Sequence, residues 1–157
     1  MTILKQYDIM YRMINRHLED VTKLVTKVFM EFEAPDYTDE GIKTFFDTAL
    51  HNQEFMDQLD IWGAYINKKL TGIIATRNNG SHIALFFVDG EHHRQGIGRR
   101  LFEAALKNSS SNELTVNASP YAREIYHHLG FKDTKTEQTV MGIRFIPMIY
   151  RSKTRDC

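Results

Sequence analysis

A run of apolar residues that leads into a glycine-containing loop restricts the fold of this chain most strongly. Leu85-Phe86-Phe87-Val88 is apolar at every position, which predicts a strand buried on both faces and therefore a central one. The segment 89–96 that follows is mostly polar, and Ile97, Leu101 and Ala105 then recur at helical spacing. The chain therefore needs a sheet with a helix packed against it, and a helix bundle is excluded.

The remaining segments predict a mixed α/β fold. Strands are expected at 7–13, 61–66, 70–76, 81–88, 114–117, 134–140 and 143–150, and helices at 17–32, 38–50, 97–108 and 119–129. This order does not fit a simple doubly wound sheet. We expect a central, mostly antiparallel sheet of about seven strands flanked by about four helices. No linker or repeat divides the chain, so residues 1–157 are expected to form a single domain.

Several residues mark the expected ends of these elements. Pro35 should break the first helix, and Thr38 is suited to cap the second. Ser119 is expected to cap the last helix with Pro120 in its first turn, and Gly130 should end that helix. Tight turns are predicted at 67–69, 78–80 and 141–142.

Composition excludes several functional classes. The 20 basic and 20 acidic residues give a net charge of zero, which offers no support for binding to nucleic acid or to an anionic membrane. Cys157 is the single cysteine, so a disulfide scaffold and a cysteine-built zinc site are excluded, and a terminal thiol is a poor catalytic nucleophile. The adjacent pairs His92-His93 and His127-His128 point apart and predict no metal site. No apolar stretch resembles a signal peptide or a membrane span, so we expect a cytoplasmic protein.

The loop at 91–98 carries the clearest chemical signal. Gly96 and Gly98 let the backbone approach a ligand closely, and the unpaired N–H groups at a helix start favour an anion. A pyrophosphate there would gain from Arg94, Arg99 or Arg100, although glycines at this spacing also make a simple tight turn. A dinucleotide fingerprint is disfavoured because position 101 is Leu, and no P-loop sequence is present.

Two segments at the right separation resemble the GCN5-related N-acetyltransferase (GNAT) superfamily. The strand 83–88, the loop 93–98 and the helix 97–108 are similar to its acyl-CoA-binding core, whose pattern is Gln/Arg-x-x-Gly-x-Gly/Ala. The segment 116–131 is similar to the family's next strand and helix, which end in Tyr-x-x-x-Gly-Phe. The tail 142–148 resembles the ending of small bacterial members. One departure is His93, which stands where the family usually has Gln or Arg.

This resemblance implies the GNAT fold and an N-acetyltransferase that uses acetyl-CoA as co-substrate, without a metal. A primary amine would attack the thioester directly in a ternary complex. Phe86 and Val88 would offer backbone groups to the acetyl and pantetheine arm, and an N–H at this strand end would stabilise the developing oxyanion. Asn117 would contact the pantetheine arm or hold a water near it. The pyrophosphate would be bound by His93, Arg94, Gln95, Gly96, Ile97, Gly98 and Arg99.

The resemblance also implies catalytic residues. Tyr126 would protonate the departing CoA thiolate. Without the resemblance, its place among the apolar residues at helical spacing in 122–129 favours a position in the core. The family's acceptor loop makes the acidic residues of 31–42 candidates for the base that deprotonates the amine, and Glu33 is our first choice. The other candidates are Glu31, Asp36, Asp39 and Glu40, of which the last two are well explained by the helix dipole. A water relay without a single base is equally compatible with the sequence.

Two classes of function compete at this stage. The first is an enzyme that acetylates a small-molecule or peptide amine, and the acidic segment 31–42 favours a cationic one. The second is a non-catalytic acyl-CoA-binding sensor or interaction module on the same fold. Tyr126 and the glycine loop favour the enzyme. No nucleic-acid or membrane partner is expected, and a homodimer remains open.

Overall fold

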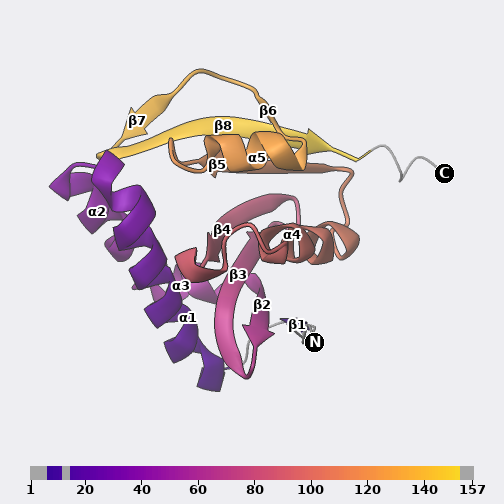
Figure 1. Cartoon of the computed structure of the whole chain (residues 1–157). Coiled ribbons are helices and arrows are strands. Elements are labelled where there is room, and N and C mark those ends of the chain that lie inside the picture. Colours follow the sequence, from indigo (N-terminus) through magenta and orange to yellow (C-terminus); the bar gives the residue numbers. More distant parts are fainter. Residues whose placement is uncertain (1–6, 12–14, 153–157) are drawn as a thin grey trace.

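The computed structural model describes residues 7–11 and 15–152 and has the expected mixed α/β architecture (Figure 1). Its strands are β1 (Tyr7–Tyr11), β2 (Asp60–Ile66), β3 (Lys69–Arg77), β4 (His82–Val88), β5 (Glu113–Ala118), β6 (Lys132–Asp133), β7 (Gln138–Val140) and β8 (Ile143–Arg151). They form a sheet of order β1-β2-β3-β4-β5-β8-β6, and β7 pairs with β8. Every pairing is antiparallel except that of β4 with β5. The prediction of a mixed, mostly antiparallel sheet is confirmed.

Five α-helices lie within the described residues: α1 (Asn15–Val28), α2 (Asp39–Phe45), α3 (Gln53–Asp57), α4 (Ile97–Lys107) and α5 (Arg123–Leu129). Shorter π- or 3-10 segments are η1 (Phe29–Glu33), η2 (Ala34–Asp36), η3 (Phe46–Leu50) and η4 (Gly90–His92). None of the helices in the described part is long and apolar enough to cross a membrane. The helix α3 was not predicted, because its apolar residues are too few to form a periodic stripe.

Several predicted boundaries hold and others are wrong. The Thr38 side chain accepts a hydrogen bond from the Gly41 N–H, and Gly130 ends α5 with a positive φ of 107°, both as predicted. The helical run of α1 and η1 ends at Glu33, just before Pro35, as predicted, and Pro35 itself stands in the first turn of the short η2, where no N–H donor is needed. Ser119 accepts from the Ala122 N–H, but α5 itself begins only at Arg123.

The strand expected at 134–140 is wrong in extent, because pairing with β8 is divided between β6 and β7. Of the first predicted strand, residues 12 and 13 lie outside the described part, as does Cys157.

Two cores cover the opposite faces of the sheet, and Figure 1 shows α1 and α4 on either side of β3. One core packs α4 and α5 against residues such as Ile74, Ile83 and Val116. The other packs α1 and α2 against residues on the opposite face of the same strands, including Ile73 and Leu85. The alternation of side chains along the strands, interrupted by a register shift between Ile83 and Leu85 of β4, therefore divides the apolar residues between two layers of helices.

The parallel pair β4–β5 separates almost at once. Its register covers only His82 with Thr115 and Ile83 with Val116, after which the two strands diverge. Strand β4 is central, as predicted, but its burial alternates and Phe86 and Val88 are only half-buried. These two positions face the gap, so their apolar side chains line a cavity and are not enclosed in the core.

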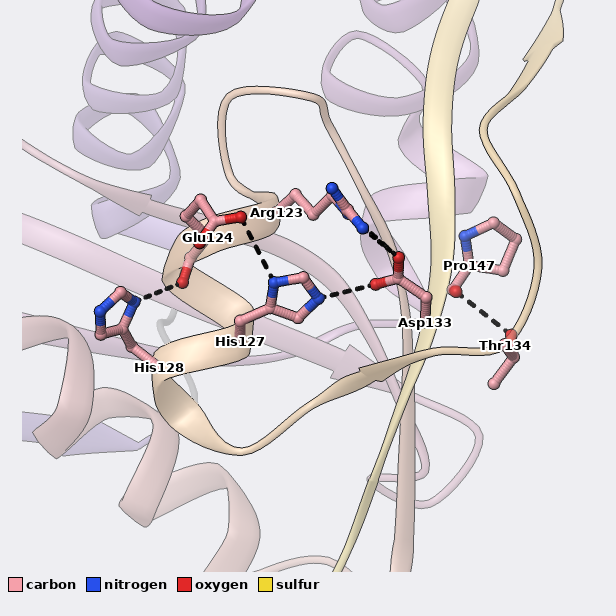
Figure 2. A network of polar contacts seen from close by, with 7 residues as sticks. All are labelled: Arg123, Glu124, His127, His128, Asp133, Thr134 and Pro147. Atoms are coloured by element: carbon pink, nitrogen blue, oxygen red, sulfur yellow. Dashed lines mark hydrogen bonds and ion pairs between the residues drawn. The ribbon is translucent and has the colours of Figure 1, made fainter.

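Polar contacts hold α5 to the outer strands of the sheet (Figure 2). Asp133 of β6 accepts from the Arg123 Nε at 3.1 Å and bonds to the His127 Nε2 at 2.8 Å. These two partners lower the pKa of the Asp133 carboxyl. The Thr134 N–H next to it donates to the Pro147 carbonyl of β8 at 2.8 Å. His127 thus anchors the helix that carries Tyr126.

The hairpin of β7 and β8 is seated on α2 through two glycines. A Cβ added to Gly41 would lie 2.1 Å from the Gly142 carbonyl oxygen, and Gly142 itself has a φ of +81°. The Thr44 hydroxyl donates to the Met141 carbonyl at 2.8 Å beside this contact. The backbones therefore touch directly, and no side chain larger than hydrogen fits between them.

We expect Gly41→Ala to destabilise the fold by roughly 1–3 kcal/mol, because backbone atoms must move to accommodate the methyl group. Urea unfolding would measure the loss. Gly98→Ala is the matched control, since its added Cβ would meet its nearest neighbour, the Phe86 ring, at an ordinary 3.6 Å. Equal stability of the two variants would contradict the direct contact between Gly41 and Gly142.

Candidate functional site

A cavity of about 360 Å³ opens where β4 leaves β5. Its walls come from the end of α1, from η1, β4, the loop before α4, the start of α4, and α5 with the turn before it. The lining residues are Val28, Phe32, Glu33, Phe86, Phe87, Val88, His92, His93, Arg94, Gly96, Ile97, Gly98, Tyr121, Ala122, Ile125 and Tyr126. The cavity brings together the glycine loop, the end of β4 and both predicted catalytic residues, which are far apart in the sequence.

The edge of β4 inside this cavity carries backbone groups that β5 does not pair. The Asp89 N–H donates to the Thr71 carbonyl of β3, so residues 85, 87 and 89 direct their backbone groups toward β3. The alternation of an antiparallel ladder then directs the N–H and C=O groups of Phe86 and Val88 toward the open edge. These are the two residues that the sequence assigned to the acyl end of the cofactor.

His93 contacts this edge directly. Its Nε2–H donates to the Val88 carbonyl at 2.7 Å, and its ring lies 4.9 Å from that of Phe32. Phe32 in turn stacks on Tyr121 at 5.1 Å, so three rings cross the rim of the cavity. The sequence did not reveal these contacts, because the residues come from η1, the loop and the turn after β5, and no local pattern connects them.

The glycine loop has the geometry of an anion-binding helix start. Gly96 caps α4 with a φ of +83°, and a Cβ added there would meet no atom within 4 Å. The first turn of α4 carries no acidic side chain that would compensate the helix dipole at this end of the helix. His93, Arg94, Gly96, Ile97 and Gly98, which the sequence assigned to the pyrophosphate, line the cavity, and their binding role stays a prediction.

Two other predicted loop residues point elsewhere. The Arg99 guanidinium donates to the His128 carbonyl at 3.1 Å, at the end of α5. The Gln95 amide donates to the Glu91 carbonyl at 3.3 Å. Neither residue lines the cavity, so their side chains stabilise the loop and its contact with α5.

An ion pair between the half-exposed Lys27 and the buried Asp89 fixes the position of this loop. Asp89, only 2% exposed, accepts from the Glu91 N–H and lies 3.1 Å from the Lys27 Nζ of α1. Burial alone would raise the pKa of the Asp89 carboxyl, but the Glu91 N–H and the Lys27 ammonium outweigh it and lower that pKa. The first core helix is thereby attached to the start of the loop, a contact that the sequence pattern did not indicate.

Tyr126 and Glu33 face the same cavity. Tyr126 is 5% exposed and makes edge contacts with Phe86 at 5.9 Å and Phe131 at 5.2 Å. Burial, followed by the charge of Glu33, raises the pKa of its phenol above the ordinary value. The hydroxyl therefore stays protonated at every physiological pH.

Burial also raises the pKa of the Glu33 carboxyl, to about 7. The hydrogen bond from Ser119 opposes this rise and the charge of Asp36 adds to it. Of the acidic residues in 31–42, Glu33 is the one that lines this cavity, while Asp39 and Glu40 occupy the first turn of α2. A carboxyl with this pKa can accept a proton near neutral pH.

A second cavity of about 310 Å³ lies between α2, β5 and the β7–β8 hairpin. Its lining residues are Tyr37, Thr44, Thr48, Asn117, Val140, Met141, Ile143 and Phe145. Asn117 lies here and not in the first cavity, because it is on the exposed face of β5, opposite Val116 and Ala118. The charges of Glu33 and Asp36 raise the pKa of Tyr37 after the larger effect of burial.

No group of three or more His, Cys, Asp or Glu side chains within the described residues is arranged to hold a metal ion. The first cavity instead offers an anion site at α4, unpaired backbone groups on β4, a proton acceptor and a proton donor. This set of groups suits acyl transfer from a donor that carries phosphates.

Comparison with known proteins identifies a family and individual proteins to which this chain is similar. The family model described as "Acetyltransferase (GNAT) domain" matches residues 33–152. An uncharacterized N-acetyltransferase of Escherichia coli, YafP, is 31% identical over 86 residues. That match covers 55% of this chain and 55% of the relative, so the chain spans about half the length of the curated protein it matches.

Solved structures share the fold over nearly the whole chain. A GCN5-related N-acetyltransferase from Rhodopseudomonas palustris has a TM-score of 0.78 at 15% identity, covering 96% of this chain and 99% of that one. The PaiA N-acetyltransferase of Thermoplasma acidophilum, solved in complex with coenzyme A, has a TM-score of 0.72 at 18% identity. Its match covers 92% of this chain and 99% of that one.

Proposed function

Because this chain belongs to the GNAT family of acetyltransferases, we propose that it transfers an acetyl group from acetyl-CoA to a primary amine by direct attack in a ternary complex. The observation that carries the proposal is the cavity at the divergence of β4 and β5. It holds a helix start suited to phosphate, a carboxyl group with a pKa of about 7 and a buried phenol.

The residues of the first cavity fit acetyl-CoA. The empty space beside Gly96 and the lack of acidic side chains in the first turn of α4 would admit a pyrophosphate, with Arg94 adding positive charge. The pantetheine arm and the acetyl group would lie along the open edge of β4, beside Phe86 and Val88. The acetyl thioester supplies the activated acyl carbon. The Phe86 N–H is suited to stabilise negative charge developing on the carbonyl oxygen.

Glu33 is our choice for the base that removes the proton from the incoming ammonium. Its raised pKa makes its carboxylate a stronger proton acceptor than an exposed carboxylate, while it is still ionised above neutral pH. Its hydrogen bond to Ser119, a buried residue held by the Ala122 N–H, fixes its orientation. No other acidic residue of 31–42 lines the first cavity.

Tyr126 is our choice for the acid that protonates the departing thiolate. Its phenol lines the first cavity and remains protonated because burial and the nearby Glu33 charge raise its pKa. The approach of a basic thiolate would draw the proton from the phenol as the carbon–sulfur bond breaks.

A non-catalytic acyl-CoA-binding module is the second candidate. The observation that favours it is the hydrogen bond from His93 to the Val88 carbonyl, which occupies a backbone acceptor on the proposed cofactor edge. Such a module would bind acetyl-CoA without transferring its acetyl group. An acetyl-transfer assay with an amine panel separates the two functions.

Acetyl-CoA should stabilise the protein against thermal unfolding. At about 100 times its dissociation constant a ligand adds ~2.7 kcal/mol, which for a chain of this size is a rise of roughly 5–10 °C in the melting temperature. ATP and NAD are the controls, since the sequence lacks the fingerprints of their binding loops. A larger shift with either control, or none with acetyl-CoA, would contradict the proposed co-substrate.

We expect Tyr126→Phe to lower kcat by roughly 100-fold or more, because the phenol proton is lost while the ring and its packing remain. Steady-state kinetics with the best amine of the panel would measure this. The acetyl-CoA thermal shift should stay unchanged in the same variant. Wild-type turnover would remove the proposed acid.

We expect kcat/KM to rise with pH through about 7, as the Glu33 carboxyl loses its proton. Glu33→Gln should remove this limb, and its loss of kcat/KM relative to the wild type should be largest above about pH 7, where the wild-type carboxylate is ionised. The exposed Glu31→Gln is the matched control and should keep the wild-type profile. If the Glu33 variant also keeps the wild-type pH profile, a water relay without this base replaces the proposal.

A further inference from the structure

We infer that the imidazole of His93 is a displaceable plug, which closes the first cavity over the open edge of β4 until the arm of an acyl-CoA takes its place. The inference rests on the proposed function, because it takes the donor arm to follow this edge. It adds a step that precedes the transfer itself. The side chain of His93 must leave the Val88 carbonyl before the arm can occupy that position.

The plug holds a backbone group that the sheet leaves unpaired. The Val88 carbonyl points away from β3, and β5 has already separated from β4 at this level. Its hydrogen bond comes instead from the His93 imidazole, whose Nε2 atom lies at 2.7 Å. Because a carbonyl oxygen only accepts, the Nε2 atom carries a proton and donates it. An amide N–H of a pantetheine arm along the same edge would require this acceptor, so the imidazole and the arm compete for one position.

Two further rings extend the plug across the rim of the cavity. The centroids of the His93 and Phe32 rings lie 4.9 Å apart, and Phe32 stacks on Tyr121 at 5.1 Å with an interplanar angle of 24°. We call these three side chains the ring bridge, and all three line the first cavity. Phe32 also covers Gly90 so closely that a Cβ added to Gly90 would lie 2.8 Å from the Phe32 Cζ atom. The ring bridge therefore joins walls that come from η1, from the loop before α4 and from the turn after β5.

The loop before α4 has attachments that do not involve the imidazole. The Lys27 ammonium pairs with Asp89, and the Glu91 N–H donates to the same carboxylate. The backbone N–H of His93 donates to the Gly90 carbonyl at 3.3 Å, whichever way the ring points. The His93 side chain is only partly buried, so it can rotate toward solvent. Such a rotation breaks one hydrogen bond and one ring contact and leaves these attachments in place.

A plug of this kind lowers the affinity for the donor. The free energy of the contacts that the imidazole loses is subtracted from acyl-CoA binding, so the observed dissociation constant exceeds that of the open cavity. The usual net contribution of one hydrogen bond corresponds to roughly two- to tenfold in affinity. A side chain that bound the donor would act in the opposite direction. The sign of the effect therefore separates a plug from the pyrophosphate-binding role that the sequence assigned to His93.

His93→Ala tests the plug directly. We expect it to lower the dissociation constant of acetyl-CoA, measured by isothermal titration calorimetry, by about three- to tenfold, because no contact has to be broken first. ADP carries a pyrophosphate but no pantetheine arm, so its dissociation constant should be the same in the variant and in the wild type. His128→Ala is the matched control and should change neither constant. His128 is exposed, lines neither cavity and bonds within its own helix, to the Glu124 carbonyl.

Three results would overturn the inference. Weaker or unchanged binding of acetyl-CoA to His93→Ala would show that the imidazole does not compete with the donor. An equal gain for ADP would show that the competition does not involve the arm. If acetyl-CoA binds neither the wild type nor His93→Ala, the donor itself is wrong, and the proposed function fails together with the inference. The first two results leave the proposed function intact.

A second substitution tests the ring bridge without removing the hydrogen bond of the plug. Phe32→Leu keeps an apolar side chain over Gly90 but removes the ring contacts with His93 and Tyr121. We expect it to lower the dissociation constant of acetyl-CoA by about twofold in the wild-type background and not at all in His93→Ala, because the ring bridge acts through the imidazole. Equal gains in both backgrounds would show that Phe32 obstructs the cavity by itself and that the three rings do not act as one unit.

Discussion

The site depends on the early separation of two parallel strands. Because β4 and β5 pair over only two residue positions, the end of β4 keeps backbone donors and acceptors that no neighbouring strand satisfies. A core strand cannot leave such groups buried without a partner, so they must meet a ligand, water or a side chain. In this protein His93 occupies one of them, the Val88 carbonyl, and the others remain for the acyl donor that we propose.

The groups around this gap are fixed by contacts that reach across the fold. The ion pair of Lys27 with the buried Asp89 attaches the glycine loop to α1, and the network of Arg123, His127 and Asp133 attaches α5 to β6. Removing one partner of the first pair would leave the other charge uncompensated, which is strongly unfavourable for Asp89 because it is buried. The loop and the phenol of Tyr126 are therefore held by separate anchors on the two faces of the sheet.

Glu33 shows how the proposed chemistry opposes stability. Its pKa is raised to about 7 in the folded protein, so the folded state holds this proton more tightly than the unfolded chain. Its contribution to stability is therefore greatest below the ordinary carboxyl pKa and is lost as the pH rises through 7. The ionised form that accepts a proton from the amine is thus the form that the fold tolerates least. The hydrogen bond from Ser119 offsets part of this cost.

The sequence by itself determined the element order apart from α3 and the division of β6 from β7, the central position of β4, the caps at Thr38 and Gly130, and the position of the glycine loop before α4. Each of these depends on periodicity or on backbone preference within a few residues, which a sequence records directly. Only the tertiary structure decided that Asn117 lies in the second cavity, that His93 bonds to Val88 and that Glu33 alone among the acidic residues of 31–42 lines the first cavity. These facts depend on which face of a strand or which turn of a helix meets a distant segment, and on burial that no local pattern records.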